Sequence, residues 1–185
     1  MKAIGALLAG GQSRRMGTDK ALLPVGAGTL LDHMTARLRA LDLAEVVVCR
    51  DAPGCIADRI PGQGPLGALH SLSVDYPDRD LLVVPVDMPL LSAATLAALL
   101  TASNESQRPR HYEGYLLPLW LPLSPAAMRA IETRVTDPAA DRSLAALLRD
   151  LNAETLPLHS PETELANVNT PAEWELIVQR LIAPC

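Results

Sequence analysis

The stretch Leu7–Lys20, LLAGGQSRRMGTDK, decides the fold of this chain. It joins the end of a short apolar run, Ala3–Leu8, to a loop rich in glycine and arginine. A run of that length and character is typical of a buried strand. Because open α/β sheets bind ligands at the carboxyl ends of their strands, we expect a ligand-binding loop directly after the first strand.

Two further apolar runs, Glu45–Cys49 and Leu81–Val86, are also predicted to be buried strands, and both are rich in valine. Helical patterns lie between the runs. One extends from Leu30 to Leu41 with apolar residues at helical spacing, and another begins at Pro65, a residue that suits the first helical position. Strands that alternate with helices predict right-handed crossovers. The expected class is therefore α/β, with a mostly parallel sheet and helices on both faces.

The second half of the chain is less regular. Ser92 is predicted to cap a helix that runs through Leu100, and a polar linker is expected over Thr101–Pro109. A strand is expected over Tyr115–Leu121, at a sheet edge or bend because of Pro118 and Pro122. Three more helices are predicted, beginning at Ser124-Pro125, at Ser143 and at Thr170-Pro171-Ala172-Glu173, which has the spacing of a capping box.

Composition excludes several classes of partner. The chain has 185 residues, enough for one domain, and a net charge of −5 that argues against nucleic-acid polymers and anionic membranes. Aromatic residues make up 3% of the chain and phenylalanine is absent, so base-stacking platforms are not expected. Cys49, Cys55 and Cys185 lack metal-like spacing and are expected to be free thiols in the cytoplasm. The four histidines are scattered, and we assign them no catalytic role.

The loop itself has the composition of a polyphosphate site. Gly10 and Gly11 can expose consecutive backbone amides to an anion, and Arg14, Arg15 and Lys20 add positive charge. Lys20 is one of two lysines in the chain. The loop contains neither the GxGxxG dinucleotide pattern nor a Walker sequence. Taken by composition alone, it is also compatible with a solvated turn that carries surface arginines.

The order of residues in this loop resembles the signature of MobA-type nucleotidyltransferases, the molybdenum cofactor guanylyltransferases. That signature runs LAGG, x, S, x, R, M, G, x, D, K, and Leu8 to Lys20 match every fixed position. Four later segments are similar to elements of the same family: Asp58–Leu66, Val86–Pro89, Asp141–Leu144 and Asn167–Pro171. The resemblance covers nearly the whole chain. It implies a three-layer Rossmann-like nucleotidyltransferase fold in a single domain, with nucleotide bound by about residues 1–105 and the acceptor by about residues 106–185.

The resemblance also implies a reaction. The terminal phosphate of molybdenum-loaded molybdopterin attacks the α-phosphorus of GTP, which yields molybdopterin guanine dinucleotide and pyrophosphate. Asp87 is expected to hold Mg²⁺, Lys20 and Arg15 to stabilise charge on the phosphates, and the amides of Gly10 and Gly11 to hold the leaving group.

The guanosine is expected at Leu8, Ala9 and Gly10 and against Asp58. By position alone, Asp87 is also compatible with a turn or capping aspartate, and Asp58 with a solvated loop residue. Two asparagines of the last element, Asn167 and Asn169, are candidates for contact with metal or pterin, although asparagine before a helix is also ordinary turn chemistry.

Three positions depart from the family pattern, and they bear on the acceptor more than on the fold or the nucleotide. Cys49 stands where an asparagine is frequent, and it suits a packed small apolar residue. The segment Leu117-Pro118-Leu119 lacks the polar residue often found there, and Gly67-Ala68 replaces Ala-Gly.

The alternative functions are a related enzyme that uses CTP or another phosphorylated acceptor, such as phospholactate, and a catalytically silent nucleotide-binding protein. Gly11 and Asp19 favour GTP. The expected partners extend to molybdoenzyme apoproteins or other cofactor-biosynthesis proteins.

Overall fold

A computed structural model describes residues 2–10, 19–102 and 107–182 of the chain. Its main sheet has six strands in the order β4-β1-β5-β7-β6-β8. Their bounds are β1 Ile4–Leu8, β4 Glu45–Cys49, β5 Asp80–Pro85, β6 Arg110–Tyr112, β7 Leu119–Pro122 and β8 Glu154–Leu156. Strand β1 pairs in parallel with β4 and β5, β6 pairs in parallel with β8, and β7 runs antiparallel to both its neighbours. The mostly parallel sheet is confirmed.

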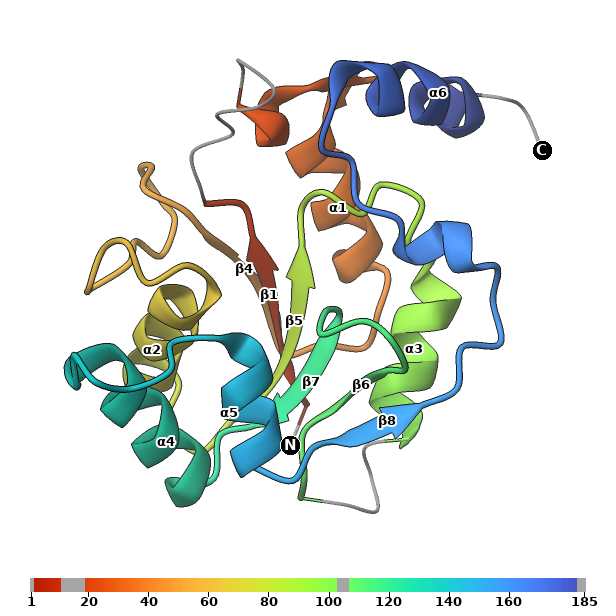
Figure 1. Cartoon of the computed structure of the whole chain (residues 1–185). Coiled ribbons are helices and arrows are strands. Elements are labelled where there is room, and N and C mark those ends of the chain that lie inside the picture. The colour runs from red at the N-terminus through yellow and green to blue at the C-terminus, as the bar shows by residue number, and fades with distance from the viewer. Residues whose placement is uncertain (1, 11–18, 103–106, 183–185) are drawn as a thin grey trace.

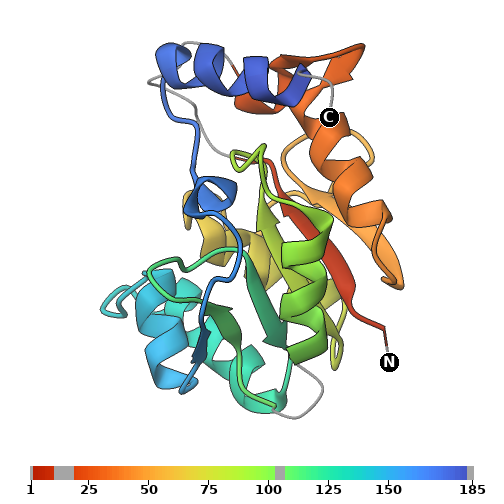
Figure 2. The ribbon, with the colours of Figure 1, turned by 90° about the vertical axis from the view of Figure 1, so that its right-hand side faces the viewer.

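The helices cover both faces of the sheet. On one face lie α1 (Leu30–Arg39) and α3 (Ala93–Ala102), and on the other α2 (Pro65–Asp75), α4 (Pro125–Thr136) and α5 (Leu144–Asp150) (Figures 1 and 2). Strand β5 serves both layers, since Leu82 packs against the first group and Leu81 against the second. A strand buried on both sides explains its continuous apolar sequence. The three-layer α/β fold is therefore confirmed.

A last helix and a small hairpin lie beyond the carboxyl ends of β1 and β5. Helix α6 (Pro171–Ile182) packs on the hairpin of β2 (Pro24–Val25) and β3 (Gly28–Thr29), as Figure 1 shows above the arrowheads of the central strands. The described residues also form the 3₁₀ helices η1 (Lys20–Leu22) and η3 (Glu162–Leu165). The second half of the chain thus returns to the hairpin that precedes α1.

The predicted helix starts are confirmed by their capping bonds. Ser92, Ser124 and Ser143 each accept a hydrogen bond from a backbone amide three residues later, at 3.1 to 3.2 Å. In the capping box of α6, Glu173 accepts from the amide of Thr170 at 3.1 Å, and the amide of Glu173 donates to the Thr170 hydroxyl at 3.3 Å.

The strand expected over Tyr115–Leu121 is shorter, and its predicted place at a sheet edge is wrong. It begins at Leu119 and lies between β5 and β6. Pro118 precedes the strand, and Pro122 is its last residue, paired with Asp80 at the end of the ladder, so neither proline interrupts the ladder between them. Residues from Tyr115 to Pro118 instead form part of the loop between β6 and β7.

Smaller differences concern the ends of elements. Helix α1 ends at Arg39, and α3 extends to Ala102 into the expected linker. Short strands β2, β3, β6 and β8 carry too few residues for a clear pattern in sequence. In the described parts of the chain, no helix combines the length and the apolar character needed to cross a membrane.

Candidate active site

A cavity of about 580 Å³ opens at the carboxyl ends of β1 and β5. One wall comes from the ends of these strands and the turn after β5, and the other from the loop between β6 and β7 and the start of α5. The lining residues are Leu8, Ala9, Gly10, Lys20, Pro65, Pro85, Val86, Asp87, Met88, Gly114, Tyr115, Leu116, Leu117, Leu144 and Asn167. The cavity therefore joins the first and second halves of the chain at the expected ligand-binding edge.

A polar cluster stands at this cavity. The ammonium nitrogen of Lys20 lies 3.2 Å from Oδ2 of Asp87 and 2.8 Å from Oδ1 of Asn169. The Lys20 and Asp87 side chains are 16% and 23% exposed, so the ion pair is largely screened from water yet open to a ligand. Asp87 and Asn169, which are 67 and 149 residues away from Lys20 in the sequence, thus contact the same ammonium group.

Backbone hydrogen bonds set the position of this cluster. The amide of Ala9 donates to the carbonyl of Cys49 and that of Val86 to the carbonyl of Leu8, both at 3.0 Å, so parallel pairing continues past the strand ends. The amide of Val168 donates to the carbonyl of Asp87 at 2.9 Å. That bond holds the segment Asn167–Pro171 next to Asp87, the candidate metal ligand.

The capping box of α6 also positions Asn169. Glu173 accepts from the backbone amide of Asn169 at 2.6 Å, in addition to its bond with Thr170. These amide bonds hold the pKa of the Glu173 carboxyl below its usual value. The start of the helix therefore fixes the backbone of the residue whose side chain reaches Lys20.

Asp19 has a structural task that sequence reasoning missed. Its side chain caps η1 by accepting from the amide of Ala21 at 3.0 Å, and it pairs with Arg50 at 2.7 Å. Because η1 begins at Lys20, this cap fixes where the lysine leaves the loop. The sequence signal for this cap is an aspartate directly before Lys20, at the point where the polar loop gives way to the apolar residues Ala21–Leu23.

Cys49, at the end of β4, and Asp58, in the segment that follows it, are not among the residues that line the cavity. Cys49 is 2% exposed, and burial, with a smaller contribution from the charge of Asp58, raises the pKa of its thiol to about 12, so it packs as a small apolar residue. Asp58 is half-buried, which raises the pKa of its carboxyl. A Cβ added at Gly67 would lie 2.8 Å from Oδ2 of Asp58, so glycine there leaves room for that carboxylate. The guanine role of Asp58 stays a prediction.

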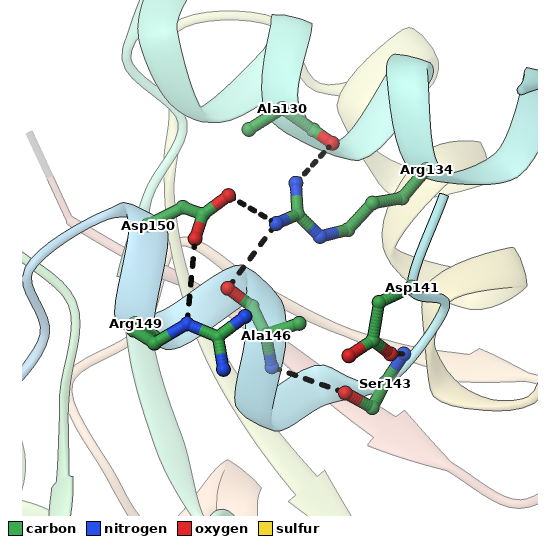
Figure 3. Close-up of polar contacts among 7 residues, drawn as sticks. All are labelled: Ala130, Arg134, Asp141, Ser143, Ala146, Arg149 and Asp150. Carbon is green, nitrogen blue, oxygen red and sulfur yellow. Dashed lines mark hydrogen bonds and ion pairs between the residues drawn. The ribbon is translucent and has the colours of Figure 1, made fainter. Parts of the chain in front are cut away.

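Helix α5 carries Leu144, which lines the cavity, and a buried arginine anchors the helix. Arg134 on α4 is 8% exposed and donates to the carbonyls of Ala130 and Ala146, each at 3.2 Å, and it pairs with Asp150 (Figure 3). At the other end of α5, Asp141 accepts from the amide of Ser143 at 2.9 Å. The segment Asp141–Leu144, one of the signature elements, is thus held so that its last residue lines the cavity.

Of the remaining predicted residues, some line the cavity and the others lie outside the described residues. Asn167 lines the cavity and is exposed. Gly11 and Arg15 lie outside the described residues, as does Arg14. Gly10 lines the cavity, and a Cβ there would be 3.5 Å from the nearest protein atom, an ordinary contact. Packing against the described protein atoms therefore leaves room for a larger residue at position 10, and the close approach of a ligand remains a reason for glycine.

The fold and this cluster of ammonium, carboxylate and amide groups at the strand ends place the chain among the α/β nucleotidyltransferases. The model of the MobA-like NTP transferase domain matches residues 5–156, and the chain belongs to that family.

Similar proteins agree with this membership. The chain is 42% identical, over 94% of its length and 93% of the other, to a molybdenum cofactor guanylyltransferase of Xanthomonas euvesicatoria. It is 33% identical to one from Rhizobium johnstonii, over 90% of this chain and 87% of that one.

Solved structures share the fold. A molybdopterin-guanine dinucleotide biosynthesis protein A from Archaeoglobus fulgidus superimposes with a TM-score of 0.75 at 17% identity, over 96% of both chains. A 2-C-methyl-D-erythritol 4-phosphate cytidylyltransferase from Thermus thermophilus gives 0.73 at 19% identity, over 99% of this chain and 100% of that one. At such low identity these two likenesses show the fold alone.

Proposed function

We propose that this nucleotidyltransferase transfers GMP from GTP to the terminal phosphate of molybdenum-molybdopterin, with release of pyrophosphate. The observation that carries the proposal is the pairing of Lys20 with Asp87 in the lining of one cavity, with the side chain of Asn169 bonded to the same ammonium group. The curated relative with 42% identity over nearly the full length is a guanylyltransferase, which supports the choice of donor and product.

The donor set at the cluster suits Mg²⁺. The Asp87 carboxylate and the Asn169 amide oxygen are hard oxygen ligands, and both already lie within 3.2 Å of one positive group, the Lys20 ammonium. Mg²⁺ usually binds through one or two carboxylates together with substrate phosphates, so a single carboxylate at a phosphate site is sufficient. When bound, the ion would neutralise negative charge on the triphosphate.

The chain's own groups are placed to bind and orient the phosphates. Lys20 supplies a compact positive charge at the end of the loop that follows β1, and the Gly10 amide lies on the same wall of the cavity. We propose that Arg15 and Gly11 also bind the phosphates. Since the attacking phosphate is already ionised near neutral pH, positioning and charge neutralisation carry the reaction and no general base is needed.

We assign the guanosine to the carboxyl end of β1. Leu8, Ala9 and Gly10 line the cavity there, and backbone carbonyls in such a position can accept from guanine N1–H and its exocyclic amine. Asp58 is assigned the same task. Its half-buried carboxylate is near the start of α2, whose first residue, Pro65, lines the cavity.

The acceptor is assigned to the opposite wall. Gly114–Leu117 and Leu144 come from the second half of the chain and form a largely apolar surface. Such a surface suits a planar ring system better than a sugar phosphate. We therefore propose that about residues 1–105 bind nucleotide and about residues 106–185 bind pterin within the single domain.

The proposal extends to a cytoplasmic location and to molybdoenzyme apoproteins or other cofactor-biosynthesis proteins as partners, because the product is a cofactor that other enzymes use.

The test is product formation from GTP and molybdenum-loaded molybdopterin, with Asp87→Asn as its matched variant. We expect pyrophosphate release that requires both substrates and Mg²⁺, and a loss of roughly a hundredfold or more in the variant, because the amide removes the negative charge that holds the ion. Thermal unfolding of the variant is expected to stay close to that of the unsubstituted protein.

A catalytically silent nucleotide-binding protein is the other class of function. It predicts GTP binding without pyrophosphate release at any acceptor concentration. Unchanged turnover in Asp87→Asn would instead remove Asp87 from the site while leaving the transfer itself in place.

A further inference from the structure

The loop between β6 and β7, residues 113–118, forms much of the cavity wall assigned to the acceptor. Gly114, Tyr115, Leu116 and Leu117 all line the cavity. The loop begins as a tight turn, because the amide of Tyr115 donates to the carbonyl of Tyr112 at 3.0 Å and Gly114 adopts a φ of +79°. The wall therefore depends on how the chain leaves this turn.

His111, the middle residue of β6, is bonded to this turn. Its Nδ1 lies 2.7 Å from the carbonyl oxygen of Tyr115 and 3.0 Å from that of Tyr112. Both partners are acceptors, so Nδ1 carries the proton and donates. The imidazole thus bonds to both ends of the turn, and the shorter bond reaches Tyr115, one of the four consecutive residues Gly114–Leu117 that line the cavity.

We propose that His111 is a positioning residue that fixes the 113–118 loop and thereby sets the affinity for the acceptor. It does not line the cavity, so it acts through Tyr115. The loop has a second tie, from the amide of Glu113 to the carbonyl of Leu156 at 3.0 Å, which holds its start on β8. His111 holds the side of the turn that leads into the cavity wall.

Neither ionisation state of the ring removes this donor. Neutral imidazole with the proton on Nδ1 donates to Tyr115, and protonated imidazole donates from the same atom. The hydrogen bond is therefore a constant feature of the loop, and substitution is the way to remove it.

The assignment of this wall to the acceptor rests on the proposed function, and the experiment separates the two. The variants are His111→Leu, which keeps a side chain of moderate size without a donor, and His111→Asn, whose amide nitrogen occupies a place similar to that of Nδ1. His159→Ala serves as control, since His159 is exposed.

We expect His111→Leu to raise KM for molybdenum-molybdopterin about three- to tenfold, as the loss of one part-buried hydrogen bond implies. KM for GTP and the melting temperature are expected to change little, and His111→Asn is expected to restore most of the acceptor KM. An unchanged acceptor KM in His111→Leu, or equal losses for GTP and acceptor, would overturn the proposal.

Hydrogen exchange gives a readout that does not depend on activity. The peptide that covers residues 112–117 is expected to exchange faster in His111→Leu but not in His111→Asn. If the unsubstituted protein transferred no GMP while this exchange pattern held, the proposed function would fail and the loop-positioning role of His111 would stand. Equal exchange in all variants would refute that role.

Discussion

At the scale of single residues, the site depends on Lys20, one of two lysines in a chain whose other basic residues are arginines. Lys20 holds its ammonium between a carboxylate and an amide oxygen, with the side chain 16% exposed. An ammonium is a compact point charge, whereas a guanidinium is planar and larger. The space between Asp87 and Asn169 therefore matches lysine.

Lys20→Arg tests that match. We expect turnover to fall about a hundredfold, because the guanidinium retains the charge but displaces the groups that hold the phosphates. The other lysine of the chain offers the control: Lys2 is 58% exposed and pairs with Asp42 on the surface. Lys2→Arg is expected to leave steady-state kinetics unchanged. Equal activity of both variants would show that position 20 requires only a positive charge.

At the scale of elements, helix α5 is seven residues long and owes its position to tertiary contacts. Arg134 links it to α4 by bonds to Ala146 and Asp150 (Figure 3). Asp150 is 51% exposed, so water screens part of that ion pair.

Arg134→Met is therefore expected to lower the free energy of unfolding by about 1–2 kcal/mol, mainly through lost hydrogen bonds to a buried donor. It is also expected to raise KM for the acceptor, because Leu144 on the same helix lines the cavity. The control is Arg149→Met: Arg149 is 72% exposed and lies 3.7 Å from Asp150. Denaturant unfolding should show a change below about 0.5 kcal/mol there. Equal costs at both positions would contradict the anchoring role of Arg134.

At the scale of the whole molecule, local patterns predicted the parts that local physics determines. Apolar runs of strand length located β1, β4 and β5, and serine or threonine at the cap positions located the starts of four helices, α3 to α6. The contact between Lys20 and Asp87 agrees with the rule that parallel strands end at one edge of a sheet, where ligands bind.

Other features depend on contacts that leave little trace in sequence. The place of β7 inside the sheet is set by pairing with β5 and β6, whereas Pro118 and Pro122 alone indicated a sheet edge or a bend. The tie between Glu173 and the Asn169 amide, and that between His111 and Tyr115, require the folded loops to be known. The sequence therefore predicted most of the candidate residues and few of the groups that hold them in place.

The central claim is transfer of guanylate rather than cytidylate to the pterin phosphate. The direct measurement offers equal concentrations of Mg-GTP and Mg-CTP to the enzyme with molybdenum-molybdopterin and identifies the dinucleotide products by mass spectrometry. We expect the guanine dinucleotide to predominate at least about tenfold, since the donor and acceptor pattern at the strand ends suits guanine N1–H and the exocyclic amine. A product mixture dominated by the cytosine dinucleotide would contradict the account.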